Sequence, residues 1–434
     1  MTTARWFTTI ILSLLIANAI ALPLKTEKWQ TGNGAKVVFY QANDLPMLDI
    51  YVAFAAGSAY DGKLFGLSAL TTNLLNQGNG SLDATQVAEN LDQTGAQFNA
   101  ENSRDIALFH LRTLSNEEAL KPATETFTLI LNKPQFRQEA FYREKNQLLS
   151  LLLQQQESPD ETANIAFFNK LYGTHPYAHP INGTSETVKN IQSWQVRDFY
   201  KRYFVGSNAL IVIVGAVNQD KASQLAETII GGLPRGEAAI AIPETKPLAR
   251  PESEAISFPS TQTVLRLGQL GITHKTPDYF PLLIGNYILG GGAMVSQLAI
   301  AVREKRGFSY NANSQLIPMP ATGPFIIALS TKTNQAKKAM RVTREVVTRF
   351  LKNGPTEKEL ADAKQYLAGS FSLSLASNSS IATLLLRIAF YNLPDDYLDT
   401  YVAHLESVST KDIKTAFNAF IKPENLLQVT VGKL

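Results

Sequence analysis

The chain has 434 residues, 45% of them hydrophobic, and its 40 basic and 37 acidic residues leave a formal net charge of +3. This length exceeds what one ordinary hydrophobic core organises, so we expect more than one domain. The near balance of charge, with no extended basic run, excludes an obvious nucleic-acid partner. The chain contains no cysteine, which excludes disulfides, cysteine-containing zinc sites and thiol nucleophiles.

The first residues have the layout of a secretory signal. Arg5 supplies a positive start, residues 6–16 form an apolar run, and Ala19-Ile20-Ala21 places small residues where a signal peptidase reads. We therefore expect residues 1–21 to be a signal peptide. An uncleaved membrane anchor is the alternative. No other segment approaches the roughly 20 apolar residues of a membrane span, so we expect no membrane contact after cleavage.

Two patterns recur at nearly the same offset along the chain. A helix opening at Ser193 precedes the apolar run 208–215, and a helix opening at Ser409 precedes the run 425–432, so that Gly215 and Gly432 lie 217 positions apart. A second pair of helix starts, Phe65-Gly66-Leu67 and Phe280-Pro281-Leu282, repeats at an offset of 215 positions. Two agreeing offsets of about half the mature chain predict a duplicated domain.

A proline-spaced polar stretch separates the two copies. It predicts domains at residues 24–236 and 250–434, with a linker at 237–249. Within the first copy, Gln97–Ala100 and Asp105–Leu111 have the pattern of strands. Helices are expected at Glu117–Leu131 and Glu139–Gln156, separated by Lys133-Pro134. This mixture predicts an α+β fold: two homologous domains, each a mainly antiparallel sheet covered by helices.

A helix expected from Leu67 carries leucines on one face and is followed by Gly78. The segment from Ala55 to Leu67 that leads into it resembles the start of the active-site helix of peptidase family M16. In active members this helix carries the inverted zinc motif His-x-x-Glu-His, in which two histidines bind zinc and the glutamate is the general base.

Four positions that the resemblance assigns to zinc chemistry hold other residues here. Aligned on Gly66-Leu67, the motif falls on Ala69, Thr72 and Asn73, and the third zinc ligand falls on Leu151. Alanine and leucine have no donor atom, a threonine hydroxyl is a weak base and an asparagine amide is a poor zinc ligand. We therefore expect this chain to bind no metal or other cofactor.

The histidines offer no replacement site. His175 and His179 have a four-residue spacing, but Pro176 and Pro180 oppose a helix there and no carboxylate lies within the run. The remaining three, at positions 110, 274 and 404, are isolated. No Gly-x-Ser-x-Gly motif marks a nucleophilic serine either.

The second half retains a different signature of the same family. Gly290-Gly291-Gly292 leads into a helix and then into the run Arg303-Glu304-Lys305-Arg306-Gly307-Phe308-Ser309-Tyr310. By the resemblance, Arg303, Tyr310 and the three glycines Gly290, Gly291 and Gly292 bind the substrate. Arg303 holds the substrate backbone, and the Tyr310 hydroxyl donates to the oxyanion of the tetrahedral intermediate. The two residues must reach one surface, so we expect the chain to turn at Gly307 and the pair to line a concave cavity.

An Arg/Tyr pair without a zinc motif resembles the non-catalytic subunit of bacterial heterodimeric M16 peptidases, whose domains have the architecture of the LuxS/MPP-like metallohydrolases. The resemblance implies a zinc-bearing M16 homologue as partner, unfolded peptide as substrate, zinc held by the partner alone, and a location in the bacterial periplasm. Two alternatives stay open. One is a structural M16-like protein without peptide processing, and the other is a self-sufficient metallopeptidase with an unusual site.

Overall fold

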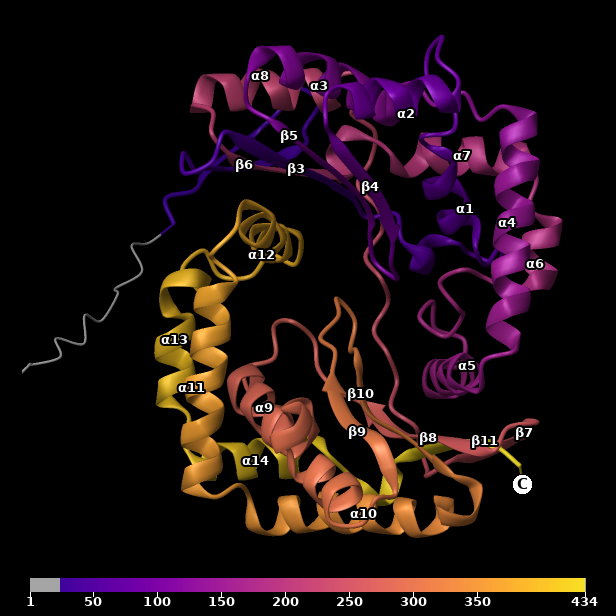
Figure 1. Cartoon of the computed structure of the whole chain (residues 1–434), viewed down its shortest axis with the longest axis vertical. Helices are drawn as coiled ribbons and strands as arrows, with labels where there is room; N and C mark the ends of the chain where they lie inside the picture. The colour runs from indigo at the N-terminus through magenta and orange to yellow at the C-terminus, as the bar shows by residue number, and fades with distance from the viewer. Residues whose placement is uncertain (1–23, 434) are drawn as a thin grey trace, which may run out of the picture.

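The computed structural model describes residues 24–433, so the expected signal peptide at 1–21 lies outside the described residues. Two domains face each other, each built on one sheet (Figure 1). The first sheet has the order β1-β2-β6-β3-β5-β4 and the second the order β7-β11-β8-β10-β9. Neighbouring strands run antiparallel except in the pairs β2–β6 and β7–β11. The expected α+β fold with two mainly antiparallel, helix-covered domains is confirmed.

The strands of the first sheet are β1 (Glu27–Gln30), β2 (Lys36–Gln41), β3 (Met47–Phe54), β4 (Gln97–Asn102), β5 (Ala107–Leu114) and β6 (Ala209–Gly215). The helices in this half are α1 (Leu67–Leu74), α2 (Ala84–Gln93), α3 (Glu117–Asn132), α4 (Gln138–Gln156), α5 (Pro159–Tyr172), α6 (Ser185–Asn190), α7 (Ser193–Tyr203) and α8 (Gln219–Ile230). The predicted helices at 117–131 and 139–156 thus correspond to α3 and α4.

The strands of the second sheet are β7 (Ser253–Ser257), β8 (Gln262–Leu270), β9 (Ser309–Leu316), β10 (Pro324–Lys332) and β11 (Leu427–Gly432). Its α-helices are α9 (Tyr279–Asn286), α10 (Ala336–Asn353), α11 (Glu357–Leu373), α12 (Asn378–Phe390), α13 (Tyr397–Ser407) and α14 (Thr410–Phe420). Two π-helical turns, η3 (Tyr287–Gly291) and η5 (Ala299–Glu304), flank a short 3-10 turn, η4 (Ala293–Val295). The sequence boundaries proposed for the two domains stay predictions.

The two strands that carry the repeated pattern occupy equivalent places. β6 lies between a parallel neighbour, β2, and an antiparallel one, β3. β11 likewise lies between parallel β7 and antiparallel β8. They end at Gly215 and Gly432, and the helices before them begin at the expected positions, with Ser409 capping α14. The equivalence agrees with a duplicated domain.

One predicted strand begins later than expected. The run Asp105–Leu111 was expected to be extended, but β5 starts at Ala107. The Ser103 hydroxyl accepts hydrogen bonds from the backbone N–H groups of Asp105 (3.3 Å) and Ile106 (3.1 Å). This side-chain turn, a common alternative to the ladder for serine, keeps Asp105 out of the strand.

Each sheet is covered on its inner face by a helix from the other half of the chain (Figure 1). α12 packs against the first sheet, where Ile381, Ala382, Leu385 and Leu386 meet Leu210, Val212 and Val214 of β6. α5 packs against the second sheet, where Ala163, Phe167 and Leu171 meet Leu427, Val429 and Val431 of β11. Because β6 is thus buried on both faces, its sequence is continuously apolar.

Within residues 24–433, no single helix is long and apolar enough to cross a membrane; only α11 and α12 together meet the length and composition test, as a pair bent by 108°.

Candidate functional site

The helix at the position of the zinc motif is firmly capped. Gly66 precedes α1 with a φ of 95°, and the Asp61 carboxylate accepts hydrogen bonds from the backbone N–H groups of Gly66 and Ser68, both at 2.7 Å. Burial raises the pKa of Asp61, and these two N–H groups oppose the rise. The Ser68 hydroxyl adds bonds to the Ala56 carbonyl (2.6 Å) and to Asn102 on β4 (2.7 Å). α1 is therefore an ordered helix even without a metal.

The four positions assigned to zinc chemistry do not form a ligand set. Ala69 and Thr72 are only 2% and 1% exposed, whereas Asn73 and Leu151 are exposed, Leu151 on α4 beside α1. The buried Thr72 hydroxyl has no hydrogen-bond partner among residues 24–433. Across that range, no three His, Cys, Asp or Glu side chains gather closely enough to hold a metal ion. The absence of metal in the protein itself stays a prediction.

The two histidines with metal-like spacing contact protein groups instead. His175 pairs through Nε2 with the Pro243 carbonyl (2.8 Å) and accepts the backbone N–H of Tyr177 at Nδ1 (3.1 Å). His179 pairs through Nδ1 with the Pro180 carbonyl (3.0 Å), and its ring stacks on Phe65 at 4.2 Å. Both rings therefore anchor the loop that follows α5.

Arg303 and Tyr310 lie on either side of a tight turn. Arg303 lies in the last turn of the π-helical segment η5, and Gly307 adopts a φ of +60°, which favours glycine. The backbone N–H of Gly307 donates to the Arg303 carbonyl (2.8 Å) and that of Phe308 to the Val302 carbonyl (2.9 Å). The turn expected at Gly307 is thus present. π-Helical turns of this kind recur at functional sites.

Tyr310 stands on β9, the edge strand of the second sheet, and is 89% exposed. The pairing of β9 with β10 shifts between Ala312 and Ser309, so the chain bulges where Tyr310 and Asn311 lie. Among residues 24–433 the Tyr310 hydroxyl forms no hydrogen bond. Arg303 is half-buried and its guanidinium contacts the thioether sulfur of Met294.

The glycine run allows the turn η3 to approach β9 closely. A β-carbon on Gly290 would lie 2.4 Å from the backbone nitrogen of Ser314, and one on Gly292 would lie 2.9 Å from the Tyr287 carbonyl oxygen. A β-carbon on Gly291 would come within 3.0 Å of Asn286, whose side-chain oxygen accepts the Ser314 hydroxyl at 2.8 Å. The run therefore sets the distance between the loop and the strand that carries Tyr310.

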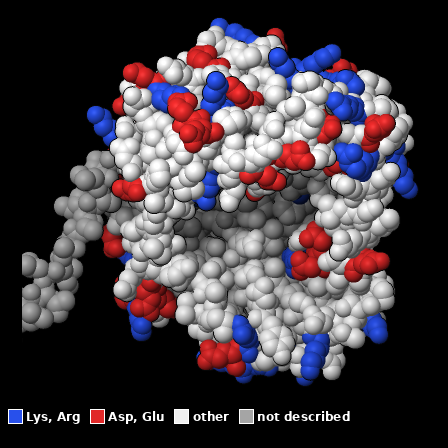
Figure 2. Space-filling view, turned by 45° about the horizontal axis from the view of Figure 1, so that its top comes forward, with Lys and Arg blue, Asp and Glu red and all other residues white. Residues whose placement is uncertain are grey.

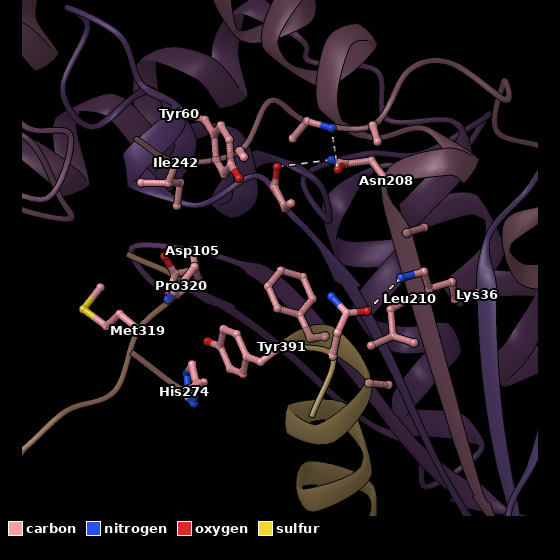
Figure 3. A pocket seen from close by; sticks show the side chains of 18 of the residues that line it. Lys36, Tyr60, Asp105, Asn208, Leu210, Ile242, His274, Met319, Pro320 and Tyr391 are labelled. Atoms are coloured by element: carbon pink, nitrogen blue, oxygen red, sulfur yellow. Dashed lines mark hydrogen bonds between the residues drawn. The ribbon is translucent and has the colours of Figure 1, made fainter. Parts of the chain in front are cut away.

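Figure 2 shows a hollow between the two domains. A cavity of about 510 Å³ also lies where both domains meet the linker (Figure 3). The cavity is lined by Tyr60, Asp105 and Asn208 of the first half, Ala239 and Ala241 of the linker, and His274, Met319 and Tyr391 of the second half. Neither Arg303 nor Tyr310 lines it, so the concave setting expected for that pair stays a prediction.

The cavity contains a buried carboxyl group. Asp105 accepts the Tyr177 hydroxyl at 2.7 Å, and burial raises its pKa to about 6, against the opposing effects of the Tyr177 hydroxyl, Arg104 and the Tyr391 hydroxyl. Arg104, the preceding residue, is half-buried, and its guanidinium lies 4.0 Å over the Phe168 ring. Burial lowers the pKa of Arg104 to about 10.

Reasoning from the sequence did not identify this cavity. The strand pattern extends over Asp105, His274 is isolated in the sequence, and no spacing along the chain links either of them to Tyr391. The adjacent charges Arg104-Asp105 beside a run of apolar residues are the one local signal.

Comparisons with known proteins place both halves in one family. Residues 37–185 match the family model described as insulinase (peptidase family M16), and residues 190–367 match the model described as the peptidase M16 inactive domain. The non-peptidase homologue YmxG of Helicobacter pylori is 27% identical over 95% of this chain and 94% of its own. An uncharacterized zinc protease YmxG of Bacillus subtilis is 24% identical over 82% of this chain and 85% of its own.

A crystal structure of a peptidase M16 inactive domain from Pseudomonas fluorescens superposes with a TM-score of 0.92 at 36% identity. The match covers 95% of this chain and 99% of that one. Together with vacant zinc positions on an intact helix α1, these matches show that the chain belongs to peptidase family M16, as a homologue of the inactive type.

Proposed function

We propose that the chain is the non-catalytic, substrate-binding subunit of an exported M16-type zinc peptidase. In this role it encloses unfolded peptide together with a zinc-bearing M16 partner and supplies Arg303 and Tyr310 to the partner's reaction. The single observation that carries the proposal is the Tyr310 side chain. It is 89% exposed on an ordered edge strand, although its neighbours hold the surrounding turn in place.

The chemistry divides naturally between two chains. The partner's zinc supplies the nucleophile, and an oxyanion donor needs only correct placement opposite it. Tyr310 offers a phenolic O–H without a competing acceptor among residues 24–433. Arg303 offers N–H donors that can bind a peptide carbonyl, and its contact with Met294 leaves the guanidinium half-exposed. The scaffold keeps both residues on one short segment.

The test is a reconstituted pair, made with the homologue that carries an intact His-x-x-Glu-His motif and assayed on an unstructured peptide. Tyr310→Phe should leave assembly intact and lower turnover roughly 10²- to 10³-fold, the usual effect of losing one oxyanion donor. Arg303→Ala should chiefly weaken peptide binding. Tyr366→Phe, another exposed tyrosine, is the matched control and should match wild type.

The competing functions give different results. If both Arg303 and Tyr310 variants match wild type in an active complex, the pair is a structural remnant and the chain is an assembly protein. If the chain alone cleaves peptide and holds one zinc, it is a self-sufficient peptidase. Export and a periplasmic location are tested by amino-terminal sequencing of the mature protein, which should start near Leu22.

A further inference from the structure

The interdomain cavity has the size and construction of a ligand site. Its volume of about 510 Å³ lies within the ~300–1,000 Å³ typical of small-molecule pockets. Both domains and the linker contribute to it, and small side chains form much of the wall: Ala55, Ala209, Ala238, Ala239, Ala241 and Ala389. A molecule bound here would touch three separate parts of the chain.

Asp105 gives the cavity one buried negative group without a direct counter-ion. Asp105 is only 5% exposed, and among residues 24–433 no basic nitrogen lies within 4.0 Å of its carboxylate. Arg104 acts at longer range, because its guanidinium turns to Phe168. The hydrogen-bond partner of Asp105 is the Tyr177 hydroxyl, and the Tyr391 hydroxyl also acts to lower the pKa of Asp105. A buried carboxylate with neutral partners is costly, and a cation beside it would offset much of that cost.

Aromatic side chains line the same cavity as the carboxylate. Tyr60, Phe390 and Tyr391 line the cavity, and Figure 3 shows Tyr391 reaching toward the region of Asp105. Burial raises the pKa of Tyr60 to about 12, and the charge of Asp105 adds to the rise. Ring faces attract organic cations, most strongly where water is excluded.

The basic side chains that line the cavity, Lys36, His274 and Lys275, do not oppose a cation strongly. His274 stacks on Tyr391 at 3.8 Å, and burial lowers the pKa of His274 to about 4, so this ring is neutral at pH 7. Lys36 is exposed and its ammonium donates to the Asn392 side chain at 3.3 Å, and Lys275 is exposed. Both ammonium groups are solvated, so their repulsion is screened.

We propose that this cavity binds a small organic cation, a primary ammonium carried on an apolar, preferably aromatic, body. The ammonium lies against the Asp105 carboxylate, and the body lies between the aromatic rings and the alanine-lined linker. Because the ligand would bridge both domains and the linker, it would stabilise their native arrangement. The proposal is independent of the proposed peptidase role.

The experiment uses the purified mature chain at pH 7.5 and three probes of one shape: phenethylamine, 3-phenylpropionate and 2-phenylethanol. We expect saturable binding by calorimetry, with a rise in melting temperature, for the amine alone. Asp105→Asn should weaken amine binding about 10- to 100-fold, the range for a hydrogen bond to a charged group. Asp44→Asn, at an exposed position outside the cavity, is the control and should leave it unchanged.

A second variant tests whether the amine binds in this cavity and leaves the charge of Asp105 unchanged. Ala241→Trp, at an exposed linker position that lines the cavity, should block the amine while the melting curve without ligand stays two-state. The proposal is overturned if the amine does not saturate, if the alcohol or acid binds equally well, or if both Asp105→Asn and Ala241→Trp retain wild-type affinity.

Discussion

Phe167 on α5 lies directly against Gly268 in β8, so closely that a β-carbon on the glycine would stand 2.8 Å from the ring's Cζ atom. The same β-carbon would stand 2.1 Å from the backbone oxygen of Phe325. A glycine inside a strand normally weakens the strand. Here it allows a helix of the first half to pack on the sheet of the second, so this contact is part of what joins the domains.

Enlarging Gly268 should therefore destabilise the whole molecule. Gly268→Val introduces atoms where α5 and β10 leave no space, and overpacking of this kind costs about 1–3 kcal/mol. Chemical denaturation should report a lower free energy of unfolding. Gly369→Ala is the control, because no atom lies within 4 Å of a β-carbon there, and a helical glycine-to-alanine change stabilises by about 0.4–1 kcal/mol. Equal effects of the two changes would contradict this account.

Helix α12 should matter to both domains at once. Leu385 is 3% exposed in the contact between α12 and the first sheet, so Leu385→Ala should cost about 2–5 kcal/mol. Leu373→Ala, at a 74% exposed position, should change stability by less than about 0.5 kcal/mol. Thermal unfolding of Leu385→Ala should shift as one transition. Two separate transitions, with only one displaced, would show that the halves unfold independently.

The purified chain should contain no stoichiometric zinc. Ala69 and Leu151 have no donor atom, and Thr72 and Asn73 have only weak ones, so elemental analysis after dialysis should find about 0.1 zinc per chain or less. Restoring the motif through Ala69→His, Thr72→Glu and Asn73→His should not simply recover binding. Positions 69 and 72 are buried in the core, so larger polar side chains there should destabilise the fold. One tightly held zinc in the unmodified chain would refute this prediction.

Asp105 should make stability depend on pH in a specific direction. Its pKa is raised from 3.8 to about 6, so between these values the folded chain binds more protons than the unfolded chain. The Asp105 contribution is therefore most favourable below about pH 4, and stability is lost as pH rises through about 6. Asp105→Asn should stabilise the chain at pH 7.5 by about 1–3 kcal/mol and give no gain at pH 4.

The difference in free energy of unfolding between Asp105→Asn and the wild type separates the effect of Asp105 from that of His274, because His274 is present in both proteins. The His274 pKa is lowered to about 4, so its contribution falls as pH drops below its usual 6.5. Denaturation curves at pH 4, 6 and 7.5 are sufficient. A variant that is less stable than wild type at pH 7.5 would show that the Tyr177 hydrogen bond outweighs the cost of burying the charge.

Local patterns predicted the parts of this molecule that local forces determine. Helices α3 and α4 could be predicted because their apolar residues recur with helical periodicity, and strand β6 because its apolar residues form an unbroken run. The loss of the zinc ligands could be predicted because the residue type at each position alone determines whether a donor atom is present. The turn at Gly307 followed from the need to bring two side chains to one surface.

The features that depend on distant segments were not predicted. The cavity brings together Asp105 and Tyr391, which are far apart in the sequence. Hydrophobic periodicity describes local structure only, so it cannot predict such a contact. The start of β5 depended on one serine hydroxyl competing with the ladder. The packing of α5 and α12 against the sheet of the other half was not predicted either. An apolar helix face shows that the helix is buried, but it does not show which sheet the helix packs against.

This packing has a consequence for biosynthesis. During synthesis the first 230 residues emerge with Leu210, Val212 and Val214 uncovered, because the leucines of α12 that cover them are more than 170 positions further on. The apolar face of α5 likewise stays uncovered until β11, close to the last residue, has been synthesised. Domains usually fold in order of emergence. Here each half needs a segment of the other to cover its apolar surface, so neither half expressed alone should give a soluble protein.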